Sequence, residues 1–150
     1  MTNHSHDTPD EDDDRWEEEF WGPDDGPAAA ELHEEPGGKP VYDLEERTAK
    51  FGEAIIRFAK KIPRSPVNDP LITQLVSAGT SVGANYCEAD DAVSRKEFKL
   101  KIGTCEKEAR ETKFFLRMVA TAEETMKPEA RKLWKEGKEL HLIFSKIWRS

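Results

Sequence analysis

The sequence has few of the residues that mark disulfide-linked or metal-binding proteins. Its 150 residues include two cysteines, Cys87 and Cys105, which do not form a CxxC motif. Two such cysteines are more often buried thiols than a disulfide or a metal site, because free cysteine is among the most buried residue types. We therefore expect two structural thiols, no metal site and no cofactor.

Long hydrophobic runs are also missing. No stretch approaches the roughly 18 apolar residues that a membrane-spanning helix needs. The acidic N-terminus lacks the basic start and apolar stretch of a signal peptide, so we expect a cytoplasmic protein without membrane contact. No segment alternates polar and apolar residues with a period of two, which argues against strands.

Charge is divided unevenly along the chain. Residues 1–40 carry 14 Asp and Glu against Arg15 and Lys39, a net charge of −12, whereas residues 41–150 have a net charge of +4. The first segment also contains runs of Gly and Pro, and it has too little apolar surface to offset the entropy of ordering. We predict a disordered acidic tail over residues 1–40 and one folded domain over residues 41–150.

Capping residues and hydrophobic periodicity predict helices in the folded domain. Asp43 and Ser94 each precede a glutamate by three positions, as in a capping box, and Asp69 with Pro70 is typical of an N-cap and first turn. The predicted helices span residues 44–62, 70–89, 95–124 and 128–148. Because short connections make consecutive helices antiparallel neighbours, the predicted fold class is an all-α, up-down-up-down antiparallel four-helix bundle.

Small residues on the second predicted helix indicate close packing. Gly79 and Gly83 are four positions apart, beside the stripe that would face the core. A GxxxG spacing is diagnostic in membrane helices alone, so here it indicates tight helix packing. Gln74, Ser81 and Glu88 repeat every seven residues beside Asn85, and we expect this polar line to form a buried or interfacial hydrogen-bond network. A catalytic carboxylate at Glu88 is the weaker interpretation.

The third predicted helix sorts its residues onto three faces at about 100° per residue. Apolar residues occupy one face, and acidic residues such as Glu97, Glu108 and Glu111 occupy one flank. The basic flank carries Lys96, Lys99, Lys107, Arg110, Lys113 and Arg117. This division suits a contact between the basic flank of one subunit and the acidic flank of the next, or a basic stripe on phosphates. A solvated charged face with i,i+4 ion pairs would give the same pattern.

Two aromatic residues favour the subunit contact. Phe114 falls within the basic arc and Phe115 lies beyond the acidic side of the core stripe, so a lone bundle would bury neither. Exposed aromatics at helical spacing commonly mark a contact surface. We therefore expect Phe114 and Phe115 to act between chains.

Other aromatic and histidine residues give weaker signals. Trp134, His141 and Trp148 repeat every seven residues along the fourth helix, a row that suits a core edge or subunit contact better than base stacking. His141 has no nucleophile or second histidine at ligand spacing, so neither a catalytic triad nor a zinc site is supported.

The acidic tail contains an aromatic cluster at Trp16, Phe20 and Trp21. Three interpretations of it stay open. It is a short docking motif, an intramolecular mimic of nucleic acid, or chance aromatics in a solvating extension.

A resemblance to a known family rests on a set of motifs in the second and third helices. They are Ser81-Val82-Gly83-Ala84-Asn85 with Glu88, Ser94-x-x-Glu97-Phe98, Gly103-Thr104, Lys107-Glu108-Ala109 and Glu111-Thr112. With these motifs the chain resembles the four-helix-bundle family of 23S rRNA intervening-sequence proteins, whose relatives include the accessory variability protein of diversity-generating retroelements. The resemblance covers roughly residues 51–147. The family commonly has Asn-Ile-Ala-Glu-Gly where this chain has Asn85-Tyr86-Cys87-Glu88-Ala89, and Ala89 favours a longer helix over a sharp turn.

The resemblance implies a non-enzymatic bundle that assembles into a ring, typically a pentamer, with a positively charged surface. For the retroelement relative it also implies binding to a reverse transcriptase and to nucleic acid. It marks Asn85, Glu88, Ser94, Glu97 and Phe98 as fold and assembly residues. We expect a homo-oligomeric scaffold or adaptor for protein or nucleic-acid partners, with no small-molecule substrate. The alternative is an RNA- or DNA-binding accessory protein acting through the basic stripe of the third helix. An enzyme is the least favoured class, because the chain shows no converging set of catalytic groups.

Overall fold

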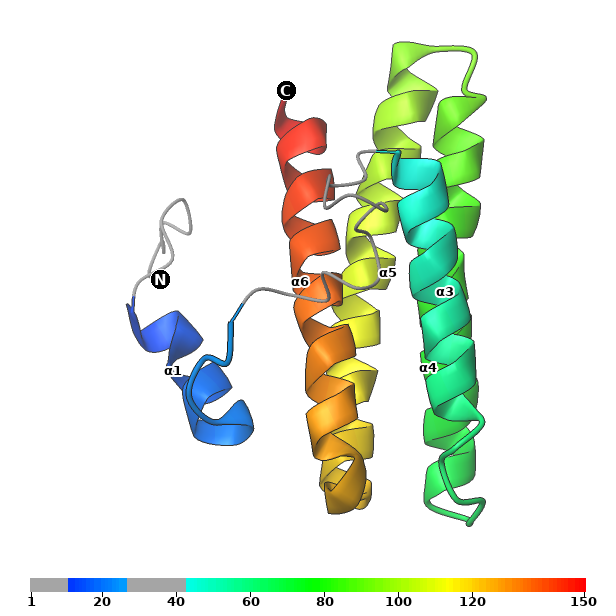
Figure 1. Ribbon diagram of the computed structural model, residues 1–150. Coiled ribbons are helices and arrows are strands. Elements are labelled where there is room, and N and C mark those ends of the chain that lie inside the picture. Colours follow the sequence, from blue (N-terminus) through cyan, green and yellow to red (C-terminus); the bar gives the residue numbers. More distant parts are fainter. Residues whose placement is uncertain (1–10, 27–42) are drawn as a thin grey trace, which may run out of the picture.

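The computed structural model describes residues 11–26 and 43–150, and all regular structure in these residues is helical (Figure 1). The helices are α1 (Glu11–Trp21), α3 (Leu44–Ala59), α4 (Asn68–Asp90), α5 (Arg95–Ala122), a short 3-10 helix (Glu124–Met126) and α6 (Lys127–Arg149). No helix in the described part of the chain is long and apolar enough to cross a membrane.

Helices α3 to α6 form an antiparallel bundle. They run alternately down and up along one axis, and the C-terminus lies at the end where α3 begins (Figure 1). Helix α3 contacts α4 and α6, and α5 contacts the same two helices. This arrangement confirms the predicted all-α, up-down-up-down four-helix bundle.

The capping residues place most helix starts where the sequence predicted them. The Asp43 carboxylate accepts the backbone N–H groups of Glu45 and Glu46 at the start of α3. The Ser94 hydroxyl accepts the N–H of Glu97 at the start of α5. Pro128 lies in the first turn of α6, where its missing N–H leaves no broken hydrogen bond. These boundaries follow from local chemistry.

Two boundaries differ from the prediction. Helix α3 ends at Ala59 instead of residue 62, because the N–H groups of Lys61 and Ile62 turn back to carbonyls three residues earlier, ahead of Pro63. Helix α4 begins at Asn68 instead of residue 70. Its Asn68 N–H is capped by the Ser65 hydroxyl at 2.9 Å.

Asp69 was predicted to cap α4, but it lies within the first turn. Its carboxylate accepts hydrogen bonds from Arg64 and from the backbone N–H of Ser65. At its other end α4 runs through Ala89 to Asp90. The expected helix extension at Ala89 is therefore confirmed. Helix α5 ends at Ala122, two residues before the predicted end, and the 3-10 helix leads into α6.

Tight packing between α3 and α4 depends on glycine. A Cβ atom on Gly79 would lie 2.8 Å from Ile55, and one on Gly83 would lie 3.1 Å from the Thr48 hydroxyl oxygen. The contact at Gly79 is too short for any Cβ unless Ile55 shifts, and the one at Gly83 is tighter than most side-chain contacts, so these glycines let the two helices approach closely. The predicted tight packing at Gly79 and Gly83 is confirmed.

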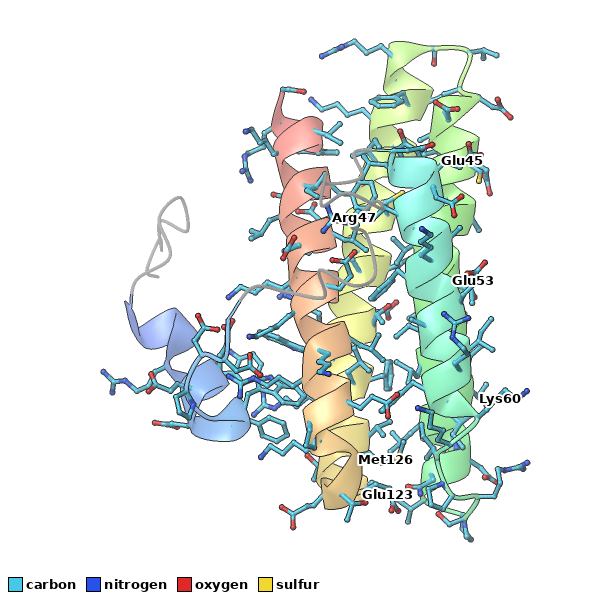
Figure 2. The ribbon with its side chains drawn as sticks, viewed as in Figure 1. Glu45, Arg47, Glu53, Lys60, Glu123 and Met126 are labelled. Atoms are coloured by element: carbon cyan, nitrogen blue, oxygen red, sulfur yellow. The ribbon has the colours of Figure 1, made fainter. Side chains whose placement is uncertain are left out.

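The core is mostly apolar, and its buried polar residues are Thr48, Asn68, Thr112 and the ion pair of Arg47 with Glu136 between α3 and α6. Phe51, Phe58 and Phe144 are among its largest fully buried side chains. The buried guanidinium of Arg47 donates to both carboxylate oxygens of Glu136, each at 2.8 Å. Figure 2 shows Arg47 pointing from α3 toward α6.

The structure corrects part of the predicted disordered tail. Within residues 1–40, Glu11–Trp21 forms helix α1, and Trp21 is 7% exposed and belongs to the main hydrophobic cluster. The reason is that Trp16, Phe20 and Trp21 lie on the side of α1 that meets α5 and α6, where they bury apolar area that the average composition of the tail conceals. Residues 1–10 and 27–40 lie outside the described residues.

Candidate interaction surfaces

Helix α1 and the turn after it lie against a basic face of α5 and α6. We call this face the α5–α6 groove, and its residues are Lys113, Arg117, Lys127, Arg131, Trp134, Lys135 and Lys138. Side chains extend into the space between α1 and α6 (Figure 2). The groove therefore combines six basic residues with one tryptophan.

Aromatic and cation–π contacts form the apolar part of the interface. The Trp134 ring of α6 lies 5.7 Å from both the Trp16 and the Trp21 rings, measured between centroids. The Arg117 guanidinium lies 4.2 Å from the Trp16 ring centroid. The Lys127 ammonium lies 4.3 Å from the Phe20 ring centroid. Contacts of this kind are worth about 0.5–2 kcal/mol each, depending on how far water is excluded.

Arg131 recognises the end of α1. Its guanidinium donates hydrogen bonds to the carbonyl oxygens of Trp21 at 3.0 Å, of Gly22 at 3.2 Å and of Pro23. Gly22 has a φ of 92°, and its N–H returns to the Glu18 carbonyl, as in a helix that stops at a left-handed glycine. Arg131 thus satisfies carbonyls that the helix end leaves open.

Carboxylates of the N-terminal segment meet the lysines of α6. Lys138 pairs with Glu17 at 2.8 Å, and Lys135 contacts Asp24 at 3.1 Å and also Asp25. The Lys135 hydrogen bonds lower the pKa of the Asp24 and Asp25 carboxyls. Both aspartates are well exposed, so these pairs contribute little to stability individually. Their role is to orient the segment.

The segment does not fill the groove completely. A cavity of about 420 Å³ remains between it and α6, lined by residues that include Glu18, Lys138 and Leu142. Trp21 also lines this cavity, and its buried Nε1–H has no hydrogen-bond partner among the described protein groups. The docked segment therefore contacts α6 without sealing the groove.

The six basic residues predicted on the third helix divide into two groups. Lys96, Lys107 and Arg110 are exposed on the outer face of α5. Lys99 lies over the Trp148 ring at 4.8 Å, Lys113 lies over Trp134 at 5.5 Å, and Arg117 contacts Trp16. The predicted single stripe is therefore two surfaces, because α6 covers one edge of it.

Phe114 and Phe115 occupy different environments. Phe114 is 54% exposed on α5, and its ring meets the Phe115 ring edge-on at 5.2 Å. Phe115 is half-buried against the hydrophobic cluster. The expectation that both lie off the core is thus wrong for Phe115, because α4 packs against the side of α5 that carries it.

The acidic flank of α5 holds a pair of close carboxyls. Burial raises the pKa of the Glu108 carboxyl, and a hydrogen bond with Glu111 raises it further. A nearby cation would favour the charged form of the Glu108 carboxyl. The flank is therefore chemically suited to a basic partner.

Among the described residues, the predicted polar line on α4 forms no buried hydrogen-bond network. The Asn85 side chain donates to the Ser81 carbonyl of its own helix at 2.9 Å. Glu88 is exposed and pairs with Lys101 of α5 at 2.5 Å, and Gln74 is exposed. The buried form of the predicted network is therefore wrong, and its interfacial form stays a prediction.

The residues at the α4–α5 turn have structural roles. The Glu97 carboxylate accepts the N–H of Val93 at 3.3 Å, one residue earlier than in a standard capping box. With the Ser94 cap, this contact fixes the start of α5. Phe98 is half-buried against the core.

The two cysteines and His141 lie in different environments. Cys105 is fully buried, as expected, whereas Cys87 is exposed on α4, so the prediction of two buried thiols is wrong for Cys87. His141 lies 3.7 Å from Glu106, and burial together with Lys113 lowers its pKa. Among residues 11–26 and 43–150, no three His, Cys, Asp or Glu side chains are grouped as for a metal ion.

Sequence reasoning missed most of the α5–α6 groove. Lys127, Arg131, Lys135 and Lys138 recur every three or four residues on α6 and so share one helix face. This spacing was a usable signal. It also missed the Arg47–Glu136 pair, since neither residue departs from the ordinary charged positions of an amphipathic helix.

Comparison with known proteins agrees with this architecture. Residues 42–146 match the sequence model of a family described as 23S rRNA-intervening sequence protein. No curated protein matches the chain. A crystal structure from Bacteroides thetaiotaomicron, of a protein with unknown function from the S23 ribosomal protein family, is similar with a TM-score of 0.63 and 25% sequence identity. That match covers 71% of this chain and 99% of the other.

Proposed function

The chain belongs to the family of 23S rRNA-intervening sequence proteins, and on that basis we propose that it is a non-enzymatic, homo-oligomeric adaptor. The subunit is the four-helix bundle. It offers charged surfaces to protein or nucleic-acid partners. The exposed free thiol of Cys87 suits the reducing cytoplasm, which is the compartment we propose.

The observation that carries the proposal is a pair of large apolar side chains on the outer face of α5. Leu100 is 67% exposed and Phe114 is 54% exposed. They are fourteen residues, or about 21 Å, apart along the helix, and the exposed Lys107 lies midway between them. Exposed apolar side chains rimmed by charges are typical of protein contact surfaces.

Charges beside these side chains favour a head-to-tail contact. At about 100° per residue, Lys107 and Arg110 lie within about 40° of Phe114 around the helix, whereas Glu111 and Glu108 lie about 60° and 120° away on one side. A cation from a neighbouring subunit would stabilise the Glu108–Glu111 pair. Because such a contact uses two different patches, repeating it closes a ring when the rotation allows. We expect a ring, with five subunits as the number that the family resemblance implies.

The test replaces Phe114 by a charge and measures mass in solution. Light scattering on a size-exclusion column should show the wild-type chain as an oligomer at micromolar concentration and Phe114→Asp as a smaller species. The control is Val67→Asp, which changes an exposed apolar residue directly before α4. A wild-type monomer contradicts the proposal, and so does an equal effect of both substitutions.

A second candidate function is direct RNA or DNA binding, favoured by the exposed cations Lys96, Lys107 and Arg110 on α5. Phosphate contacts make affinity fall steeply as the salt concentration rises. Each contact with a single strand contributes about 0.7 to the slope of log affinity against log salt concentration. Changing these three residues to glutamine should reduce the slope of log affinity against log salt concentration by about 2, measured with a fluorescently labelled RNA. If the wild-type chain binds no RNA or DNA at low salt, this candidate is excluded.

A further inference from the structure

Residues 15–26 have the features of a peptide ligand held in a binding site. They supply three aromatic rings, a row of carboxylates and a helix end to the α5–α6 groove. The groove supplies complementary groups, which are cations for the rings and carboxylates and the Arg131 guanidinium for the helix end. This complementarity defines a recognition motif, not a chance contact.

The contacts are specific to a peptide. Arg131 donates to the carbonyls of three successive residues, Trp21, Gly22 and Pro23. These carbonyls converge because Gly22 adopts the left-handed conformation that ends α1. A nucleic acid presents phosphates and bases but no such helix end. The geometry therefore favours an acidic aromatic helix as the ligand class.

The docked segment is suited to leave and rebind. The segment leaves an open pocket of about 420 Å³ beside Lys138 and Leu142, so it does not seal against α6. The side chain of Asp24 is 84% exposed in its pair with Lys135. Exposed ion pairs are weak and screened by salt, so exchange between equivalent grooves costs little.

The covalent connection also permits exchange. Residues 27–42 separate the segment from α3, and sixteen residues reach at most about 55 Å when fully extended. The longest helix, α5, has 28 residues and so measures about 42 Å. The connection is thus long enough to bring α1 to a groove on a neighbouring molecule.

We propose that the α5–α6 groove is a docking site for an acidic aromatic helix, and that in trans its occupant is residues 11–26 of a second copy of this chain. The N-terminal segment is then an exchangeable arm that links subunits. This contact is separate from the one proposed for the outer face of α5. Either contact can fail without the other.

The first experiment measures binding of a fluorescent synthetic peptide of residues 11–26 by anisotropy. The protein is the full chain with its own arm disabled by Trp16→Ala, Phe20→Ala and Trp21→Ala. We expect the peptide to bind the arm-disabled chain saturably. Its affinity for the wild-type chain should be at least tenfold lower, because the wild-type arm competes as a tethered ligand at high effective concentration. Circular dichroism melting of each variant checks that it folds.

A charge reversal in the groove tests specificity. Arg131→Glu in the arm-disabled chain should reduce peptide affinity by more than tenfold. The matched control, Lys146→Glu, makes the same charge change at an exposed position near the end of α6 and should leave affinity within a factor of two. Equal effects of the two reversals would overturn the proposal, as would the absence of saturable binding.

Competition separates peptide from nucleic acid. Unlabelled peptide should displace the labelled peptide at lower concentration than an oligouridylate RNA does. The opposite order would assign the groove to nucleic acid and overturn the proposal.

A mixing experiment tests exchange in the whole protein. One chain carries the disabled arm and the other carries Arg131→Glu with Lys135→Glu, and both carry Phe114→Asp to remove the contact proposed for the outer face of α5. Native mass spectrometry should detect a mixed dimer of these two chains. A chain that carries both the disabled arm and the disabled groove is the control, and it should form no dimer. Absence of the mixed dimer at ten times the measured peptide Kd would restrict the arm to its own groove and contradict the trans occupant.

Discussion

The guanidinium of Arg47 and the carboxylate of Glu136 form a buried, two-point ion pair that joins α3 to α6. Arg47 also donates to Glu139, which is 41% exposed. Removing one partner of a buried pair leaves an uncompensated charge and costs about 3–5 kcal/mol. Arg47→Met should lower the free energy of unfolding by this amount in urea titration.

Two further variants test that explanation. Glu139→Gln should cost less than about 1 kcal/mol, since exposed pairs contribute little. The double variant Arg47→Met/Glu136→Leu should recover most of the loss, because no charge is then left unpaired. A double variant as unstable as Arg47→Met alone would show that the pair acts in another way.

The contact between Gly79 and Ile55 predicts a destabilising alanine. A Cβ on Gly79 would meet both γ carbons of Ile55 within 2.9 Å. The clash should cost about 1–3 kcal/mol, which exceeds the gain of about 1 kcal/mol that alanine brings to a helix. Thermal unfolding of Gly79→Ala should therefore give a lower Tm.

The exposed Ser77 on the same helix provides the control, and Ser77→Ala should not lower the Tm. In an Ile55→Ala background, which removes the clashing carbons, the additional cost of Gly79→Ala should shrink. An undiminished cost would place the strain elsewhere in the α3–α4 contact.

The two thiols should react at very different rates. Cys87 is exposed, whereas burial raises the pKa of the Cys105 thiol to about 12. Since the thiolate is the reactive form, a thiol reagent at pH 8 should modify Cys87 in the native protein and Cys105 only on unfolding. Mass spectrometry of tryptic peptides identifies the site, and native labelling of Cys105 at the rate of Cys87 would contradict the buried position.

His141 should make stability fall in mild acid. Burial is the main cause that lowers the pKa of His141 below its ordinary value of 6.5, and Lys113 and Arg110 act in the same direction against Glu106. The unfolded chain therefore takes up this proton at a higher pH than the folded chain, and stability is lost as the pH falls through and below 6.5. His141→Gln should reduce the fall in Tm between pH 7 and pH 5.5. An unchanged slope would exclude His141 as its source.

The bundle was predictable because its signals are local. Ser94 and Pro128 act within one helical turn, so the starts of α5 and α6 lie within a residue of the prediction. The early end of α3 was missed because the turn at Ile62 depends on carbonyls of the preceding turn and on Pro63. Each of these effects involves residues close in sequence.

The surfaces were harder to predict because they depend on distant residues. Helix α1 is stabilised by Arg131 and Lys135, more than 100 positions away in the chain. The half-burial of Phe115 and the exposure of Cys87 depend on which faces of α5 and α4 their neighbours cover. The angular periodicity of one helix does not show which of its faces the neighbouring helices cover.

Sedimentation velocity of the wild-type chain over a wide concentration range tests the central claim, self-association into a closed ring, most directly. We expect one discrete multiple of the 17.1 kDa subunit at micromolar concentration, with no larger species as concentration rises, because a ring leaves no unpaired contact. Five subunits is the expected multiple. A single species at the mass of the monomer across the range would contradict the account.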